Sequence, residues 1–473
     1  MSDFDDALQV ANKHDTKSSL LQETATRILK YRNSTAERPV APVVEFDKLL
    51  AAFGGPLPTR GSTPEQVIEQ LVAAAEPGLV ATTGPRYFGF VVGGALESAT
   101  CADMLAIGWD QPAFNAVTSP AAAAVEQVVG EWLKQLLRIP AGASFGLVTG
   151  GQGANTVALA AARHRVLANA GWDVEAQGLF GAPSLRVIAS VERHATIDRS
   201  LRLLGLGTRG IVPVAADSNG AIDTAELARV LASGAAGPTI VCLQAGNVNT
   251  GACDDLARAA AIAHRHGAWV HVDGAFGLWA AACERTAPLV AGIEQADSWS
   301  VDGHKWLNVP YDSGYVFCAD AKAHLASMSF TAAYLVGHGR GSLRAPSDYV
   351  PESSRRARGF ATWAALRELG TCGVSDLVER CCALARRFGE ALGRLEGVTI
   401  GNAIVLNQVL VSFGSDERTE RILAAVQREG TCWMGGTTWR GRRYMRISVS
   451  NWSTTEDDVD RSVAAIRGAM SRA

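Results

Sequence analysis

SWSVDGHKWLNVPYDSG, residues 298–314, is the stretch from which the fold can be worked out, and Lys305 stands at its centre. It is the only lysine between Lys134 and Lys322, in a chain that otherwise prefers arginine for its positive charges. A lysine amine can lose its proton and attack an aldehyde to form an imine, which a guanidinium cannot do. The adjacent His304 and the apolar neighbours indicate a buried setting, where a lysine costs free energy unless it is paired, shifted in pKa or covalently used. On this segment alone, a lysine that reaches from a strand end into solvent is the alternative.

A glycine turn in SFGLVTGGQGANTVAL, residues 144–159, supplies a candidate phosphate site. The apolar run ends in Thr149–Gly153, and an alanine-rich helical stretch follows to about Leu167. A glycine turn that opens a helix presents unpaired backbone N–H groups at the positive end of the helix macrodipole, which suits a phosphate. Glycine turns before helices are common, so this motif is a weak signal by itself.

Two further strand ends carry chemically useful side chains. In GAWVHVDGAFG, residues 267–277, a buried strand ends at Asp273, which can pair with a protonated pyridine nitrogen or simply cap a turn. In VIASVERHATID, residues 187–198, His194 stands at a strand-to-helix junction, where it can lie over a planar cofactor or act as an acid or base. The four segments bring a phosphate turn, a histidine, an aspartate and a lysine to the ends of apolar strands, a combination far more specific than any one of them.

Taken together, these segments resemble the group II amino-acid decarboxylases, which are pyridoxal-phosphate (PLP) enzymes of the aspartate aminotransferase fold (fold type I). The matching stretches are Asn115–Pro120 with Glu126, Thr149–Asn155, His194, Asp273–Ala275, Asp302–Trp306, and Ser354–Arg358 with Trp363. The resemblance extends from about residue 80 to the C-terminus. It implies an α/β protein with a mainly parallel seven-stranded sheet in its large domain, a smaller α+β C-terminal domain, PLP as the cofactor, and a homodimer with active sites at the interface.

The resemblance also implies roles for individual residues. Lys305 resembles the Schiff-base lysine, Asp273 the partner of the pyridine nitrogen, His194 the histidine stacked on the ring, and Ala275 the small residue packed beneath it. The other cofactor positions that it implies are Gly150, Gly151 and Gln152 in the phosphate turn, Ser300 and His304 as additional phosphate contacts, and Asn247 close to the cofactor. Gly303 and Gly153 depart from the family, which usually has a proline and an acidic residue at these positions, but neither is a reacting group.

The reaction implied is α-decarboxylation of an amino acid to an amine and CO2 through an external aldimine and a quinonoid intermediate. Return of a proton to Cα needs an acid, for which Tyr349 is the first candidate and Tyr334 the competing one, unless Tyr349 only packs in its loop. Arg446 can hold a substrate carboxylate or form a structural ion pair, and Phe114 can line the substrate pocket. A carbon–carbon lyase or aldolase, or an aminotransferase, on the same fold is the alternative, and a non-catalytic binding protein on a degenerate scaffold is the alternative of another class.

Composition and charge narrow the class of protein. The chain has 473 residues, a formal net charge of −3 and nine cysteines without a Cys-x-x-Cys spacing. We therefore expect no nucleic-acid partner, no metal site and a reducing, cytoplasmic location. The polar, acidic start argues against a secretory signal, and no apolar run is long enough to span a membrane.

The order of patterns along the chain predicts three parts. Residues 1–78 read as a helical arm that lies across a partner subunit, residues 79–345 as the large PLP-binding domain, and residues 346–473 as the small domain. Strands are expected at 185–191, 211–214, 239–243, 268–272, 298–301 and 315–318, with helices between them. The segment from Val336 to Pro351 reads as a mobile loop, and the small domain is expected to contain helices near 361–369 and 374–395.

Overall fold

The computed structural model describes residues 19–42, 44–234, 237–330 and 344–472. Its large domain is built on a seven-stranded sheet with the strand order β2-β8-β7-β6-β5-β3-β4. The strands are β2 (Ser144–Val148), β3 (Arg186–Ser190), β4 (Ile211–Val214), β5 (Thr239–Gln244), β6 (Trp269–Asp273), β7 (Ser298–Asp302) and β8 (Gly314–Cys318). Only the two pairings made by β8 are antiparallel, so the mainly parallel sheet expected from the sequence is confirmed.

Helices cover both faces of this sheet, which explains why its central strands are apolar along their whole length. Every residue of β5, β6, β7 and β8 is buried. On one face α7 (Gly151–Asn169) crosses the strands, with α9 (Ala195–Leu203) and α12 (Ala321–Met328) packed against it. The opposite face is covered by α11 (Leu256–Arg265), which packs beside α10 (Thr224–Ser233). The short α8 (Val174–Gln177) follows α7.

The small domain combines a five-stranded sheet with three helices. Its helices are α13 (Gly359–Gly393), α14 (Asp416–Glu429) and α15 (Glu456–Met470), and its sheet has the order β1-β11-β12-β10-β9. The strands are β1 (Tyr87–Phe88), β9 (Thr399–Ile400), β10 (Gln408–Ser412), β11 (Trp433–Trp439) and β12 (Arg442–Ser448). The two helices expected at its start form one continuous element that breaks its helical geometry at Gly370, where φ is 60°.

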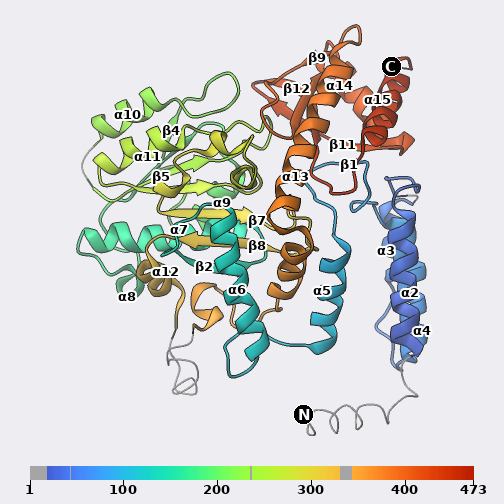
Figure 1. Ribbon diagram of the computed structural model, residues 1–473, viewed down its shortest axis with the longest axis horizontal. Helices are drawn as coiled ribbons and strands as arrows, with labels where there is room; N and C mark the ends of the chain where they lie inside the picture. The colour runs from blue at the N-terminus through green and yellow to red at the C-terminus, as the bar shows by residue number, and fades with distance from the viewer. Residues whose placement is uncertain (1–18, 43, 235–236, 331–343, 473) are drawn as a thin grey trace.

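The strand β1 connects an early part of the chain to the small domain. Tyr87 and Phe88 pair in parallel with Trp433 and Met434, so a segment that the sequence pattern placed in the large domain completes the small sheet (Figure 1). The Tyr87 ring also stacks on the Trp433 ring, with 5.1 Å between the ring centroids.

Three helices form the described part of the N-terminal segment. They are α2 (Ser19–Ser34), α3 (Phe46–Phe53) and α4 (Pro64–Ala75), and they lie together at one side of the molecule beside α5 (Glu97–Trp109) (Figure 1). Arg32 on α2 reaches α5 by donating to the Thr100 hydroxyl at 2.9 Å. A further helix, α6 (Pro120–Leu136), leads from this side into β2.

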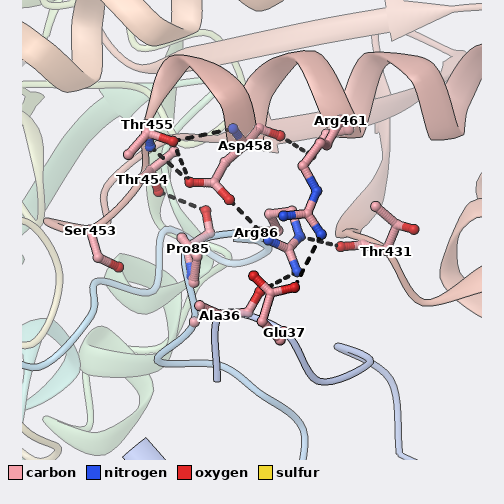
Figure 2. A network of polar contacts seen from close by, with 12 residues as sticks. Ala36, Glu37, Pro85, Arg86, Thr431, Ser453, Thr454, Thr455, Asp458 and Arg461 are labelled. Atoms are coloured by element: carbon pink, nitrogen blue, oxygen red, sulfur yellow. Dashed lines mark hydrogen bonds and ion pairs between the residues drawn. The ribbon is translucent and has the colours of Figure 1, made fainter. Parts of the chain in front are cut away.

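A buried ion pair fastens this N-terminal side to the small domain (Figure 2). The Arg86 guanidinium lies 3.0 Å from Asp458, and the two side chains are only 4% and 9% exposed. Arg86 also donates to the carbonyl oxygens of Thr431 and Ala36, and Asp458 in turn accepts from Thr455 in the capping box of α15. One arginine therefore holds together three segments that are far apart in sequence.

We expect Arg86→Met to lower the free energy of unfolding by about 3–5 kcal/mol, because it leaves the Asp458 carboxylate buried without its cation. The matched control is Arg229→Ala, which removes an exposed ion pair to Glu226 and is expected to cost less than about 1 kcal/mol. Urea unfolding followed by circular dichroism measures both. Equal losses in the two variants would contradict the structural role of Arg86.

Candidate active site

Five segments bring polar groups to one edge of the large sheet. This edge is formed by the carboxyl ends of the parallel strands, where open α/β sheets place their ligands. β2 leads into Gly150, β3 into His194, β5 into Asn247 and β7 into Lys305, while Asp273 is the last residue of β6. The sequence predicted Gly150, His194, Asp273 and Lys305 at strand ends, and the structure has them there; Asn247 was expected only from the resemblance.

Lys305 forms an ion pair that sequence reasoning missed. Its Nζ lies 2.9 Å from Oδ2 of Asp302, whose side chain is 3% exposed. The other oxygen, Oδ1, accepts from the backbone N–H of Gly151 at 2.5 Å, at the first residue of α7. Asp302 therefore places a negative charge between the lysine amine and the helix N-terminus. The signal for this role was an acidic residue three positions before the lysine.

The turn that carries Lys305 is held against a pair of glycines. The N–H of Gly93 donates to the His304 carbonyl at 3.3 Å, and a Cβ at Gly93 would lie 1.8 Å from the Lys305 carbonyl oxygen. Asn308, which has a φ of 56°, accepts from Gly94 N and donates to the Ser450 carbonyl. The lysine turn is thus tied both to the segment after β1 and to the small domain.

Asp273 accepts hydrogen bonds at both oxygens. The N–H of Ala275 donates to Oδ1 at 3.2 Å, while Asn155 Nδ2 and the Thr196 hydroxyl lie 3.1 and 3.4 Å from Oδ2. Hydrogen bonds at both oxygens fix the plane of the carboxylate. The Asp273 side chain is buried, with 5% of its surface exposed.

His194 is the N-cap residue of α9 and lies next to the same threonine. Its Nδ1 accepts from the backbone N–H of Thr196 at 3.3 Å and lies 2.8 Å from the Thr196 hydroxyl. Burial lowers the pKa of His194; the charge of Asp273 opposes this effect, and the charges of Lys305 and Arg446 add to it. The lowered pKa favours the neutral form of the His194 imidazole, which interacts with the charges of Asp273 and Lys305.

Glycines line the turn that opens α7. A Cβ at Gly150 would lie 2.8 Å from Cε1 of His304, and a Cβ at Gly314 would lie 2.4 Å from the Cα of Gly150. Gly151 is buried and presents its N–H to a carboxylate oxygen. Backbone donors at a helix N-terminus form a cradle for an anion, and here the Asp302 carboxylate accepts one of them.

The other residues predicted at the phosphate hydrogen-bond to protein groups. Gln152 donates to the Ser200 hydroxyl at 2.8 Å, and the fully buried Ser300 hydroxyl donates to Asn155 Oδ1 at 2.6 Å. His304 accepts from Ser313 N at 3.1 Å and stacks on Tyr311. Their contact with a phosphate stays a prediction.

Asn247 and Ala275 lie at the edge of the site. Asn247 is fully buried and donates to the Glu192 carbonyl at 3.0 Å, so it fastens the loop that leads to His194. Ala275 is half-buried, and its carbonyl accepts from the N–H of Asp302 at 2.9 Å. Contact of either residue with the cofactor remains a prediction.

Arg446, on β12, approaches the site from the small domain. One of its Nη atoms lies 3.5 Å from Asn249 Oδ1, and its Nε is buried with no hydrogen-bond partner among the described residues. Burial lowers the pKa of Arg446. A buried guanidinium N–H without an acceptor lowers the stability of the protein. A bound anion could accept a hydrogen bond from it.

Tyr349 and Phe114 lie in a different environment. Tyr349 ends the short 3-10 helix Pro346–Tyr349, with its ring edge against His324 and the Arg344 guanidinium 4.5 Å above it. Phe114 is half-buried, and its carbonyl accepts from Ser347 N, next to that helix. This packing agrees with a structural Tyr349, and its proposed proton transfer remains a prediction. Tyr334 and residues 336–343 of the expected mobile loop lie outside the described residues.

The donor set at this edge suits PLP. The glycine turn before α7 fits a phosphate, and Lys305 provides an amine on the turn after β7. Asp273 is a hydrogen-bonded carboxylate at the end of β6, the strand next to β7. The buried Arg446 Nε supplies a further unused donor for a bound acid. In the part of the chain that the structure describes, no group of three or more His, Cys, Asp or Glu side chains could hold a metal ion.

Comparison with known proteins agrees with this geometry. The model of the pyridoxal-dependent decarboxylase conserved domain matches residues 49–414, and the chain belongs to this family. Tryptophan decarboxylase 1 of Oryza sativa subsp. japonica is 27% identical over 94% of this chain and 92% of its own length. Aromatic-L-amino-acid decarboxylase of Bacillus atrophaeus is 24% identical over 91% of each chain.

Solved structures have the same fold. The crystal structure of Oryza sativa TDC with PLP and tryptamine has a TM-score of 0.89 at 23% identity and covers 97% of this chain and 98% of its own. Mouse CSAD has a TM-score of 0.87 at 22% identity, with 96% and 98% covered. The chain is therefore a PLP-dependent amino-acid decarboxylase of fold type I, as the sequence analysis expected. No helix among the described residues is both long and apolar enough to cross a bilayer.

Proposed function

We propose that Lys305 carries the cofactor covalently, that Asp273 pairs with its pyridine nitrogen and that His194 lies over its ring. Gly150 and Gly151 would hold the phosphate at the N-terminus of α7, where Asp302 now accepts the Gly151 N–H. When bound, the cofactor accepts the electrons of the bond that is broken. The protein has to orient the Asp273 carboxylate and keep His194 in its neutral form. The hydrogen bonds of Asp273 and the lowered pKa of His194 support these two roles.

Arg446 is proposed to bind the substrate carboxylate. The Nε of Arg446 is buried and has no hydrogen-bond partner among the described residues. The charge of Arg446 also contributes to the lowered pKa of His194, which supports a position near the proposed ring site. A carboxylate held there would be fixed relative to the cofactor plane, and this orientation determines which bond to Cα is broken. Phe114 is proposed as a second substrate contact, contributed across the dimer interface.

The substrate is proposed to be an aromatic amino acid, which is decarboxylated to its amine. The observation that carries this proposal is Phe90, whose side chain is 62% exposed and whose φ of 53° is unusual for a large residue. Phe90 lies three residues before Gly93, which contacts the Lys305 turn, and its ring is 5.4 Å from that of Trp433. An exposed aromatic ring in the segment that contacts the lysine turn suits an aromatic side chain. The relatives named above as tryptophan and aromatic-L-amino-acid decarboxylases support the same substrate class.

A substrate screen tests this proposal. The PLP-loaded protein is incubated with tryptophan, tyrosine, phenylalanine, glutamate, aspartate and histidine, and CO2 and amine are quantified. We expect kcat/KM for at least one aromatic amino acid to exceed kcat/KM for glutamate, aspartate and histidine by about tenfold or more. Phe90→Ala should reduce this preference. A preference for an acidic substrate would contradict the proposal. An aldehyde with an amino acid, or amino transfer to a keto acid, would instead indicate the aldolase or aminotransferase reaction.

The protein is also proposed to work as a homodimer. No residue of α3 or α4 is buried, although Phe46, Leu50 and Phe53 on α3 are apolar and 74%, 61% and 55% exposed. On α5, Leu105, Ile107 and Trp109 are exposed as well. Apolar surface of this extent is typical of a subunit interface, and a second copy of the chain would cover it.

Sedimentation equilibrium tests the assembly. We expect a mass of twice the 49.8 kDa of one chain, and dissociation in the variant Phe46→Glu/Leu50→Glu. Leu57→Glu, at a residue that is 92% exposed, serves as the control for added charge. A fully active monomer would rule out the proposed interface.

A cytoplasmic location is proposed from the cysteines. All nine are free, and six of them are buried. Thiols that remain unpaired in a folded protein are typical of a reducing compartment.

A further inference from the structure

The interface between α7 and the large sheet contains a polar stripe in which Asn155, His271 and Ser298 have no role so far. Trp269, His271 and Asp273 alternate along β6 and therefore point to the same face of the sheet. Ser298 and Ser300 lie opposite His271 and Asp273 on β7. His271, Ser298 and Ser300 are completely buried, and Asn155 of α7, which covers them, is 1% exposed. Polar groups this deep lower stability unless all of them are hydrogen-bonded.

The hydrogen bonds in the stripe have a defined direction. A carboxylate only accepts, so the atom of Asn155 that faces Asp273 Oδ2 at 3.1 Å is the donor Nδ2. The opposite atom, Oδ1, must then accept, and it faces the Ser300 hydroxyl at 2.6 Å and Nε2 of His271 at 2.9 Å. His271 therefore carries its proton on Nε2.

The other half of the stripe agrees with this tautomer. Burial lowers the pKa of His271 to about 4, although the charge of Asp273 on the same strand opposes the shift, so the ring is neutral. Its Nδ1 accepts from the Ser298 hydroxyl at 3.0 Å, and that hydroxyl oxygen accepts from Trp269 Nε1 at 2.9 Å. Each group thus donates to the next, from Trp269 through Ser298, His271 and Asn155 to Asp273.

We propose that His271 and Asn155 are positioning residues whose one-way chain of hydrogen bonds fixes the plane of the Asp273 carboxylate. Polarisation along such a chain strengthens its last bond, which is the one made to the carboxylate. The proposal rests on the pairing of Asp273 with the pyridine nitrogen. It adds to that pairing a role for Asn155, which hydrogen-bonds to the carboxylate, and for His271, which hydrogen-bonds to Asn155. Neither residue has a proposed contact with the cofactor.

The test compares two buried histidines. His271→Phe removes the donor to Asn155, whereas His271→Gln keeps an N–H at the end of the side chain. The matched control is His324→Phe: His324 is also fully buried, lies 2.9 Å from the Ser144 hydroxyl and from the Tyr349 carbonyl oxygen, and has a pKa lowered by burial to about 3. Within the described residues, His324 makes no hydrogen bond to the stripe, so its loss should affect stability without affecting Asp273.

Three quantities are measured for each variant: thermal stability of the cofactor-free protein, the dissociation constant of PLP, and the absorption spectrum of the bound cofactor as a function of pH. For His271→Phe we expect an altered pH–absorbance curve, PLP affinity reduced about tenfold and a lower kcat at nearly unchanged KM. His271→Gln should recover most of the PLP affinity. His324→Phe should lose stability while its spectrum and PLP affinity stay as in the wild type.

Two results would overturn the proposal. In the first, His271→Phe matches the wild type in spectrum and PLP affinity, or His324→Phe changes both equally. In the second, Asp273→Asn itself leaves the spectrum unchanged, in which case the pairing with the pyridine nitrogen has failed and not the relay alone. If His271→Phe does not fold, Asn155→Leu is measured in its place with the same expected results. It removes the donor on α7 that hydrogen-bonds directly to Asp273.

Discussion

Lys305→Ala is expected to abolish decarboxylation, with a loss of at least about a thousandfold in kcat, and to leave the protein unable to retain PLP through desalting. Alanine has no amine with which to form the covalent link, and the Asp302 carboxylate loses the cation that lies 2.9 Å away. The visible absorbance of the lysine-bound cofactor, and its change on borohydride reduction, measure the link directly.

Two further variants separate chemistry from charge. Lys305→Arg keeps a positive charge near Asp302 but cannot form an imine, so we expect it to be as inactive as the alanine variant. Lys322→Ala removes the next lysine in the chain, an exposed residue of α12, and should behave as the wild type. A borohydride-reducible chromophore that persists in Lys305→Ala would refute the assignment.

Asp273→Asn is expected to lower kcat at least about a hundredfold while some PLP remains bound. A neutral amide cannot stabilise a charged pyridine nitrogen as a carboxylate does. It would also place an amide opposite the Asn155 Nδ2, which now donates to Asp273 at 3.1 Å. Activity at saturating PLP, with cofactor content determined by absorbance, measures the effect.

Asp254→Asn is the matched control for Asp273→Asn. Asp254 is also buried, but it accepts from the backbone N–H groups of Ile222 and Gln244 and makes no hydrogen bond to Asp273 among the described residues. This variant should lose stability and keep its turnover per bound cofactor. Near-normal turnover in Asp273→Asn would show that another group faces the ring.

The strands were predictable because the sequence signals that define them are local. β4 has the bounds expected from its pattern, β7 is one residue longer at its carboxyl end, and β6 is shifted by one residue along the chain. In a parallel sheet covered on both faces, a strand is a short apolar run, and polar residues mark its carboxyl end. The joining of β1 to β11 could not be predicted in this way. It pairs Tyr87 with Trp433 across most of the chain, and a two-residue strand leaves no periodicity to detect.

Sequence reasoning names the candidate site residues one by one, but it does not reveal the network that joins them. Lys305, Asp273 and His194 stood out because a reactive side chain at a strand end is unusual. Asp302 was part of the same motif, yet its ion pair depends on how the turn folds back, which the sequence does not reveal. The bonds between Asn155 and His271 join a helix to a strand far along the chain, so only the folded structure brings them together.

The most direct test of the central claim is to locate the cofactor on the chain. The wild-type protein is loaded with PLP, reduced with borohydride and digested, and the modified peptide is identified by mass spectrometry. We expect the phosphopyridoxyl group on Lys305 within residues 298–314 and on no other lysine at comparable yield. Modification of a different lysine, or no stable adduct at all, would contradict the assignment of this edge of the sheet as the active site.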